Sequence, residues 1–223
     1  MAEHDGLPNL CVIDHPLVRD KVTWMRSTTT GRRAFRALVE QIAGLMVYEA
    51  TRDLRVESVE VETPLETTLG HRLSGSMTVV PVLRAGLGMV RGVVEMLPSA
   101  RIGHLGLSRD ETTLEPRTYV STLPDDLGAG PVLLLDPMLA TGGSASSAAS
   151  ILRERGAEDL RMLCLVGAPE GVGRMLEDHP DVMIYAAVLD ERLDERGYIR
   201  PGLGDAGDRL FGTGAWTNTI EIP

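Results

Sequence analysis

The stretch from Val132 to Ser144, which reads VLLLDPMLATGGS, decides the fold of this chain. Its first four residues are apolar, with a Gly-Pro pair before them and an Asp-Pro pair after them, and such a run predicts a strand buried on both faces of a sheet. The polar loop that follows leads into residues that favour a helix from about 146 to 155, where Gly156 predicts the end. A strand, a loop and a helix are therefore expected in that order.

The loop of this stretch has the chemistry of an anion site. Its glycines allow the backbone to approach a ligand closely, and the start of the following helix presents free N–H groups and the positive end of the helix dipole. Thr141 and Ser144 add hydroxyl donors. We therefore interpret the loop as a phosphate-binding loop. An ordinary strand-to-helix turn is the alternative, and the Gly-Lys-Ser/Thr of a Walker loop is missing.

A second stretch has the same design. Residues 78 to 83 predict another buried strand, and Arg84 then stands before two glycines and a helix that runs through Val94. A guanidinium beside free backbone N–H groups suits a pyrophosphate. The alternative is that Arg84 pairs with a surface carboxylate.

A third strand is expected from Ile102 to Leu107, and a polar segment that reaches Pro124 follows it. This segment is either a plain surface hairpin or a lid, because open parallel sheets bind ligands where their strands end.

The rest of the chain completes an α/β pattern. Residues 15 to 48 predict two helices, with the break and the second N-cap in Ser27 to Thr30, and residues 56 to 69 predict a hairpin. The apolar stripe of the second helix is expected to face the core or another subunit. After the central loop, a strand (161–167), a helix (170–179) and a strand (182–189) follow. The fold class is thus α/β, a mostly parallel twisted sheet flanked by helices.

Composition excludes several classes of protein. The chain has 223 residues and a formal net charge of -10, so we expect it to bind neither nucleic acid nor an anionic membrane surface. Cys11 and Cys164 are the only cysteines, which makes a disulfide framework or a zinc site improbable, and the histidines have no metal-ligand spacing. No run of 18 apolar residues and no leader pattern is present, so a cytoplasmic protein is the expectation.

Three motifs together resemble those of the uracil phosphoribosyltransferases, within the type I phosphoribosyltransferase family. They are DPMLATGGS from Asp136, PVLRAGLGM from Pro81 and DERGYIRPGLGDAGD from Asp194, and the resemblance extends from His15 to Gly212. It implies a single phosphoribosyltransferase-like domain over 1–223. Its parts are N-terminal helices and a hairpin (1–75), the core sheet with the site (76–190), a C-terminal hood that binds uracil (191–212) and a tail (213–223).

The resemblance implies an enzyme that converts uracil and 5-phospho-α-D-ribose 1-diphosphate (PRPP) to UMP and diphosphate in pyrimidine salvage. The implied catalytic residues are Arg84 and Asp205. The implied PRPP-binding residues are Arg84, Arg109, Asp136, Pro137, Met138, Leu139, Ala140, Thr141, Gly142, Gly143, Ser144 and Asp205. The implied uracil-binding residues are Ile199, Gly204, Asp205 and Ala206. A non-proline cis peptide, found in the pyrophosphate loop of relatives, is expected at Arg84-Ala85.

The resemblance also implies Mg²⁺ that arrives with PRPP, so that no metal site made of protein ligands alone is expected. GTP activates some relatives, so GTP is an expected effector, although no motif in this sequence locates its site. The apolar stripe of the second helix and the resemblance together favour a homo-oligomer, a dimer or a tetramer.

This chain departs from the family at Ser108, where relatives usually have Tyr, and at Arg200, where an apolar residue is expected. Most of the wider family also has two adjacent acidic residues where Asp136-Pro137 stands. The alternatives are a phosphoribosyltransferase for another base, a nucleotide-sensing regulator that retains the PRPP fold, and a non-catalytic oligomeric scaffold.

Overall fold

A nine-stranded sheet organises the molecule, for which the computed structural model describes residues 6–109 and 116–214. Its strands are β1 (Leu10–Val12), β4 (Thr78–Leu83), β5 (Arg101–Ile102), β6 (His104–Arg109), β7 (Pro116–Thr122), β8 (Val132–Leu135), β9 (Met138–Leu139), β10 (Leu160–Gly167) and β11 (Met183–Leu189). The main order is β1-β11-β10-β8-β4-β6-β7, with β5 beside β4 and β9 beside β10. All these pairs are parallel except β6 and β7, so the predicted mostly parallel sheet is confirmed.

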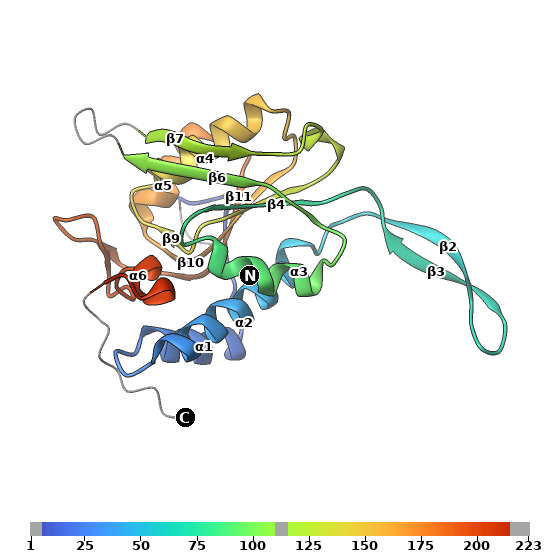
Figure 1. The fold of residues 1–223 in the computed structure, drawn as a ribbon, viewed down its shortest axis with the longest axis horizontal. Coiled ribbons are helices and arrows are strands. Elements are labelled where there is room, and N and C mark those ends of the chain that lie inside the picture. Colours follow the sequence, from blue (N-terminus) through green and yellow to red (C-terminus); the bar gives the residue numbers. More distant parts are fainter. Residues whose placement is uncertain (1–5, 110–115, 215–223) are drawn as a thin grey trace.

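Helices cover both faces of the sheet (Figure 1). The helices on one face are α1 (Pro16–Arg26), α2 (Arg32–Ala50) and α3 (Leu87–Met96), and those on the other are α4 (Gly143–Glu154) and α5 (Pro169–Asp178). Each layer has its own apolar core. Val79 packs in the first core and its neighbour Val80 in the second, because successive side chains of a strand point to opposite faces. This double burial explains why β4 and β8 lack a polar alternation.

The predicted hairpin is confirmed as β2 (Val56–Glu62) and β3 (Thr67–Leu73), which project from the body of the molecule as an arm (Figure 1). Its apolar side chains remain largely exposed, with Leu65 at 95% and Leu69 at 70%.

The apolar stripe of α2 faces the core of its own chain. Phe35, Val39, Ile42 and Met46 are all fully buried there, so this stripe is not available to another subunit. The predicted N-cap in Ser27 to Thr30 was wrong, because Gly31 holds that position and the Thr30 hydroxyl donates to the Trp24 carbonyl instead.

Several element boundaries differ from the prediction. The strand expected from Ile102 to Leu107 is divided at Gly103 into β5 and β6, and α4 begins at Gly143 rather than near 146. The polar segment after β6 returns as β7, so this part of the chain forms an antiparallel hairpin, whose tip (110–115) lies outside the described residues. Strand β1 was not predicted, since three residues at a sheet edge carry no periodic signal.

The glycine-rich hood contains more regular structure than its sequence suggests. The short elements β12 (Arg192–Leu193) and β13 (Ile199–Arg200) pair with each other, and helix α6 (Ala206–Phe211) follows. The Asp194 carboxylate organises the turn between the two strands, because it accepts hydrogen bonds from the backbone N–H groups of Arg196 and Tyr198 and from the Arg200 guanidinium. Arg200, which departs from the expected apolar residue, therefore has a structural partner.

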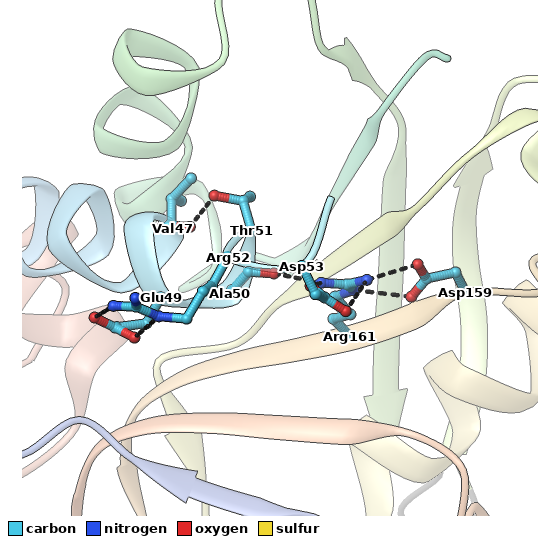
Figure 2. A network of polar contacts seen from close by, with 8 residues as sticks. All are labelled: Val47, Glu49, Ala50, Thr51, Arg52, Asp53, Asp159 and Arg161. Carbon is cyan, nitrogen blue, oxygen red and sulfur yellow. Dashed lines mark hydrogen bonds and ion pairs between the residues drawn. The ribbon is translucent and has the colours of Figure 1, made fainter. Parts of the chain in front are cut away.

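At the amino end of β10, a buried arginine joins the sheet to the end of α2 (Figure 2). Arg161 donates to the Ala50 carbonyl at 2.7 Å and forms ion pairs with Asp53 and Asp159. These contacts raise the pKa of Arg161 and lower that of Asp53.

None of the described helices has the length and apolar character needed to cross a membrane.

Candidate active site

The three predicted loops meet at a cavity of about 340 Å³, where β4 and β8 end. Arg84 is the first residue after β4, Asp136 is the first after β8, and Asp205 comes from the hood. The residues that line the cavity are Arg84, Ala85, Asp136, Met138, Ala140, Gly197, Tyr198, Ile199, Gly204, Asp205, Ala206 and Gly207. The volume falls within the usual range for small-molecule sites, and the position is the ligand edge of open parallel sheets.

The Arg84 loop lies tightly against the neighbouring strand. A Cβ at Gly86 would approach the Leu135 carbonyl oxygen to 2.4 Å, so only glycine allows this path. Helix α3 begins directly afterwards, but its first three N–H groups already donate to the carbonyls of Arg84, Ala85 and Gly86, so the predicted free backbone donors are not present here. The exposed Arg84 side chain is the donor that this loop offers to a ligand. A non-proline cis peptide is present, but it joins Leu83 to Arg84, so the position predicted at Arg84-Ala85 was wrong by one bond.

The phosphate-loop candidate is also shaped by glycine. Gly142 has φ of 77° and forms the N-cap of α4, and a Cβ there would lie 2.8 Å from the carbonyl oxygen of Gly171 in α5. Since other residues would meet both strain and a clash, this glycine fixes where α4 starts. The helix consequently begins within the loop, and its N-terminus is the predicted place for a phosphate.

Asp136 is a half-buried carboxyl group in the cavity wall. Burial raises its pKa to about 7, and the hydrogen bond that it accepts from the Met138 backbone N–H opposes that rise. Burial and the nearby Asp136 also raise the pKa of the Cys164 thiol, so this cysteine is not a nucleophile. The Asp136 carboxyl is therefore poised to ionise when a ligand supplies hydrogen-bond donors.

The hood closes against both loops. A Cβ at Gly197 would contact the Thr141 methyl group at 3.7 Å, and a Cβ at Gly88 would overlap the Leu210 side chain of α6 at 2.7 Å. Asp205 accepts a hydrogen bond from the Asp208 N–H through Oδ1 and thereby caps α6. The capping bond orders Asp205 at the cavity wall and occupies one of its two carboxylate oxygens.

The family model described as uracil phosphoribosyltransferase matches residues 12–213. The chain belongs to the uracil phosphoribosyltransferase family. It is 56% identical over 208 residues to the uracil phosphoribosyltransferase of Listeria innocua, covering 93% of this chain and 100% of that protein. It is 54% identical over 202 residues to that of Clostridium acetobutylicum, covering 90% and 97%.

A solved structure of the AQ2163 protein from Aquifex aeolicus has the same fold, with a TM-score of 0.88 and 37% identity over 92% of this chain and 99% of that one. Together with the family model, this likeness over most of the chain confirms the predicted phosphoribosyltransferase-like architecture.

Eight of the residues predicted from the uracil phosphoribosyltransferase motifs line the cavity, and they are Arg84, Asp136, Met138, Ala140, Ile199, Gly204, Asp205 and Ala206. Pro137 and Leu139 are buried and offer at most their backbone, while Thr141 borders a separate surface hollow beside α5. Gly142, Gly143 and Ser144 lie at the start of α4. Arg109 ends β6 at the same edge of the sheet, and its side chain lies outside what the structure describes.

Four lining residues were not predicted, namely Ala85, Gly197, Tyr198 and Gly207. Each lies next to a predicted residue or within the hood motif. Their sequence signal was the motif itself, but only the fold shows which of its backbone segments face inward.

A larger cavity of about 500 Å³ lies on the other side of the hood, lined by residues of the α1–α2 connection and by Arg200, Gly202, Leu203 and Arg209. Of the predicted family site residues, only Gly204 reaches it. Arg26 and Arg209 in its wall are already bound to protein oxygens. The smaller cavity is therefore the candidate active site.

Proposed function

We propose that this protein transfers the 5-phosphoribosyl group of PRPP to N1 of uracil, which yields UMP and diphosphate. The observation that supports this most strongly is the convergence of Arg84, Asp136 and Asp205 on one cavity. These residues come from three separate segments whose motifs match the family. Relatives that are more than half identical carry the name uracil phosphoribosyltransferase.

The proposed roles follow from the geometry. Arg84 binds the diphosphate, because a guanidinium is a forked donor for phosphate oxygens. The loop from Thr141 to Ser144 and the N-terminus of α4 bind the 5-phosphate, and the Asp136 carboxylate accepts hydrogen bonds from the ribose hydroxyls. Arg109 is a further proposed ligand of PRPP.

We propose that backbone groups of the hood at Ile199 and Gly204 to Ala206 bind uracil. Main-chain N–H and C=O groups can pair with the alternating donors and acceptors of a pyrimidine at fixed geometry. Ile199 is 5% exposed and Ala206 is 2% exposed, so their side chains pack inward and hold this backbone firmly.

In the reaction, the bond between C1 and the diphosphate oxygen breaks while the bond between N1 and C1 forms. Negative charge grows on the leaving diphosphate, and Arg84 is placed to stabilise this charge in the transition state. Uracil must lose its N1 proton. Asp205 is the carboxylate at the cavity wall next to the proposed base site, and we propose its free oxygen as the acceptor.

The donor set fits Mg²⁺ that arrives with PRPP. Magnesium is usually bound through one or two carboxylates, water and substrate phosphates, and the cavity has the Asp136 and Asp205 oxygens in its wall. Within residues 6–109 and 116–214, no group of three or more His, Cys, Asp or Glu could hold a metal ion by itself. When bound, Mg²⁺ would neutralise diphosphate charge.

We further propose a single-domain cytoplasmic enzyme that forms a homo-oligomer. With the α2 stripe buried, the exposed apolar side chains of the β2–β3 arm are the better support for subunit contact. GTP as an effector stays a prediction that rests on the family alone.

The test is formation of UMP from PRPP and uracil, followed by chromatography, with orotate, cytosine, hypoxanthine and xanthine as competing bases. We expect UMP as the product and no comparable turnover of the other bases. A folded protein that binds PRPP but prefers another base would overturn the proposed substrate. Absence of any turnover would overturn the enzyme assignment.

A further inference from the structure

One backbone unit of the hood, Gly202, is held at both of its polar groups. Its N–H donates to Asp190 Oδ2 at 2.9 Å, and its carbonyl accepts from Arg26 Nη1 at 3.2 Å. Arg26 in turn forms a two-pronged ion pair with the Asp190 carboxylate. Both charged side chains are largely withdrawn from water, at 21% exposure for Arg26 and 3% for Asp190. Three elements are thereby joined, namely the end of α1, the residue after β11 and the hood.

The next hood residue is held by a second arginine. Arg209 donates to the Leu203 carbonyl at 2.9 Å and also to the carbonyls of Met25 and Ser27 at the end of α1. Its guanidinium lies 4.1 Å from the centre of the Phe35 ring, and burial lowers its pKa. Arg209 therefore bridges the hood to the first two helices. None of these contacts involves a residue that lines the candidate active site.

These contacts hold Gly202 and Leu203, which lie between the two proposed uracil-binding segments, Ile199 and Gly204 to Ala206. Leu203 precedes Gly204, the first residue of the segment that lines the 340 Å³ cavity, whereas Arg26, Asp190 and Arg209 do not line it. Gly202 has φ of 63°, and a Cβ there would lie 2.1 Å from the Ile199 carbonyl oxygen, so the chain turns sharply at the held position. A shift of the backbone at Gly202 or Leu203 would therefore also move the adjacent backbone groups that we propose bind uracil.

We propose that Arg26, Asp190 and Arg209 are positioning residues that set where the uracil-binding backbone lies, without touching uracil themselves. This inference rests on the proposed function. It predicts a selective effect, because most of the proposed PRPP ligands belong to the Arg84 and Asp136 loops, which these three side chains do not contact in the described structure. Loss of the hood contacts raises KM for uracil and leaves KM for PRPP nearly unchanged.

The test uses Arg26→Lys, Arg26→Gln, Asp190→Asn and Arg209→Lys in the full-length protein. KM for uracil is measured at saturating PRPP, and KM for PRPP at saturating uracil. We expect KM for uracil to rise roughly tenfold in Arg26→Gln and Asp190→Asn, with KM for PRPP changed less than about twofold. The lysine variants retain the charge and the fold, and so carry the test if the neutral variants do not fold; we expect them to raise KM for uracil by ~3-fold.

The double variant Arg26→Gln/Asp190→Asn tests whether the two side chains position the hood as a pair or whether each substitution weakens uracil binding independently. If the two side chains act as a unit, its KM for uracil equals that of either single variant, whereas independent effects would multiply. Arg161→Lys is the matched control, because it makes the same change in the buried cluster of Figure 2, at the other edge of the sheet.

Equal increases in both KM values, or an unchanged KM for uracil in folded variants, would overturn the proposal. The wild-type protein in the same assay distinguishes this failure from failure of the proposed function, since only the latter leaves the wild type without UMP formation.

Discussion

Arg26 and Arg161 are both largely buried guanidinium groups with aspartate partners, but they lie at opposite ends of the sheet's strands. Arg26 contacts a loop of the hood, whereas Arg161 contacts the end of helix α2. Around Arg26 the carboxylate is the more deeply buried partner, and the contacts reach the loop that lines the candidate active site. Around Arg161 the arginine side chain is 9% exposed while Asp53 and Asp159 are 69% and 45% exposed, and the contacts join the end of a helix to a strand.

The comparison shows that similar chemistry has consequences set by location. Where parallel strands begin, an ion cluster joins regular elements and contributes to stability. Where they end, loops diverge around the candidate site, and the same kind of cluster contacts the hood segment that we propose binds uracil. The carboxyl edge also contains Asp136, a half-buried carboxyl in the cavity wall without an arginine partner among the described contacts. Desolvation raises its pKa to about 7, so its charged form is unfavourable in the ligand-free protein.

The largest effect is expected from Arg84→Ala. If Arg84 stabilises the charge that grows on the leaving diphosphate, as we propose, kcat/KM for PRPP should fall ~10²–10³-fold. Uracil binding should change far less, and steady-state kinetics with each substrate varied in turn checks this. Equal losses for both substrates would contradict the diphosphate role and weaken the division of labour at the carboxyl edge.

Asp205→Asn should lower kcat by ~100-fold, at the low end of what a general base contributes. Asparagine is as good an N-cap as aspartate, so α6 and the melting temperature should be preserved. Turnover is measured by rapid UMP quantification, with calorimetry for stability. Near-normal turnover would remove Asp205 from proton transfer.

Asp136→Asn should lower kcat/KM for PRPP by roughly 10–100-fold, because a hydrogen bond to a charged acceptor contributes about 1.5–3 kcal/mol. Its effect on stability has the opposite sign. The folded-state pKa of about 7 lies above the unfolded value of 3.8, so the wild-type protein loses this stability as pH rises from 3.8 to about 7, and loses no more of it above that pH.

The Asp136→Asn variant has no carboxyl group to ionise at this position, so it does not undergo this pH-dependent loss of stability. Its melting temperature should exceed that of the wild type at pH 8 and match it near pH 4, with each ~1 kcal/mol shifting Tm by roughly 2–4 °C. Thermal unfolding across this pH range is the measurement. A variant less stable than the wild type at pH 8 would show that Asp136 is not held against its charge.

The smallest effect on catalysis is expected at the amino edge. Arg161→Gln should leave both KM values unchanged and lower the free energy of unfolding by about 1–3 kcal/mol, because buried hydrogen bonds to charged groups are lost. Asp53→Asn is the matched control, and since that carboxylate is mostly exposed it should cost less than about 1 kcal/mol. A change in KM for uracil in either variant would break the distinction between the two edges.

The sequence by itself determined most of the sheet and the loops of the candidate site. Unalternating apolar runs at β4 and β8 predicted doubly covered strands, and the glycine loops that follow predicted anion sites, because both signals are local and depend on few residues. The family motifs then supplied Arg84, Asp136 and the hood. The short elements β1, β12, β13 and α6 escaped prediction, since they depend on pairing and capping partners distant in the chain or on turns without period.

Only the tertiary structure decided what the buried charges do. Nothing near Arg26 in the sequence distinguishes it from a solvated helix residue, and its partners Asp190 and Gly202 are 164 and 176 residues away. The burial that raises the pKa of Asp136 likewise comes from neighbours across the sheet. Secondary-structure propensity and sequence motifs depend on residues that are close together in the chain. Desolvation and long-range hydrogen bonds exist only after folding has brought distant segments together.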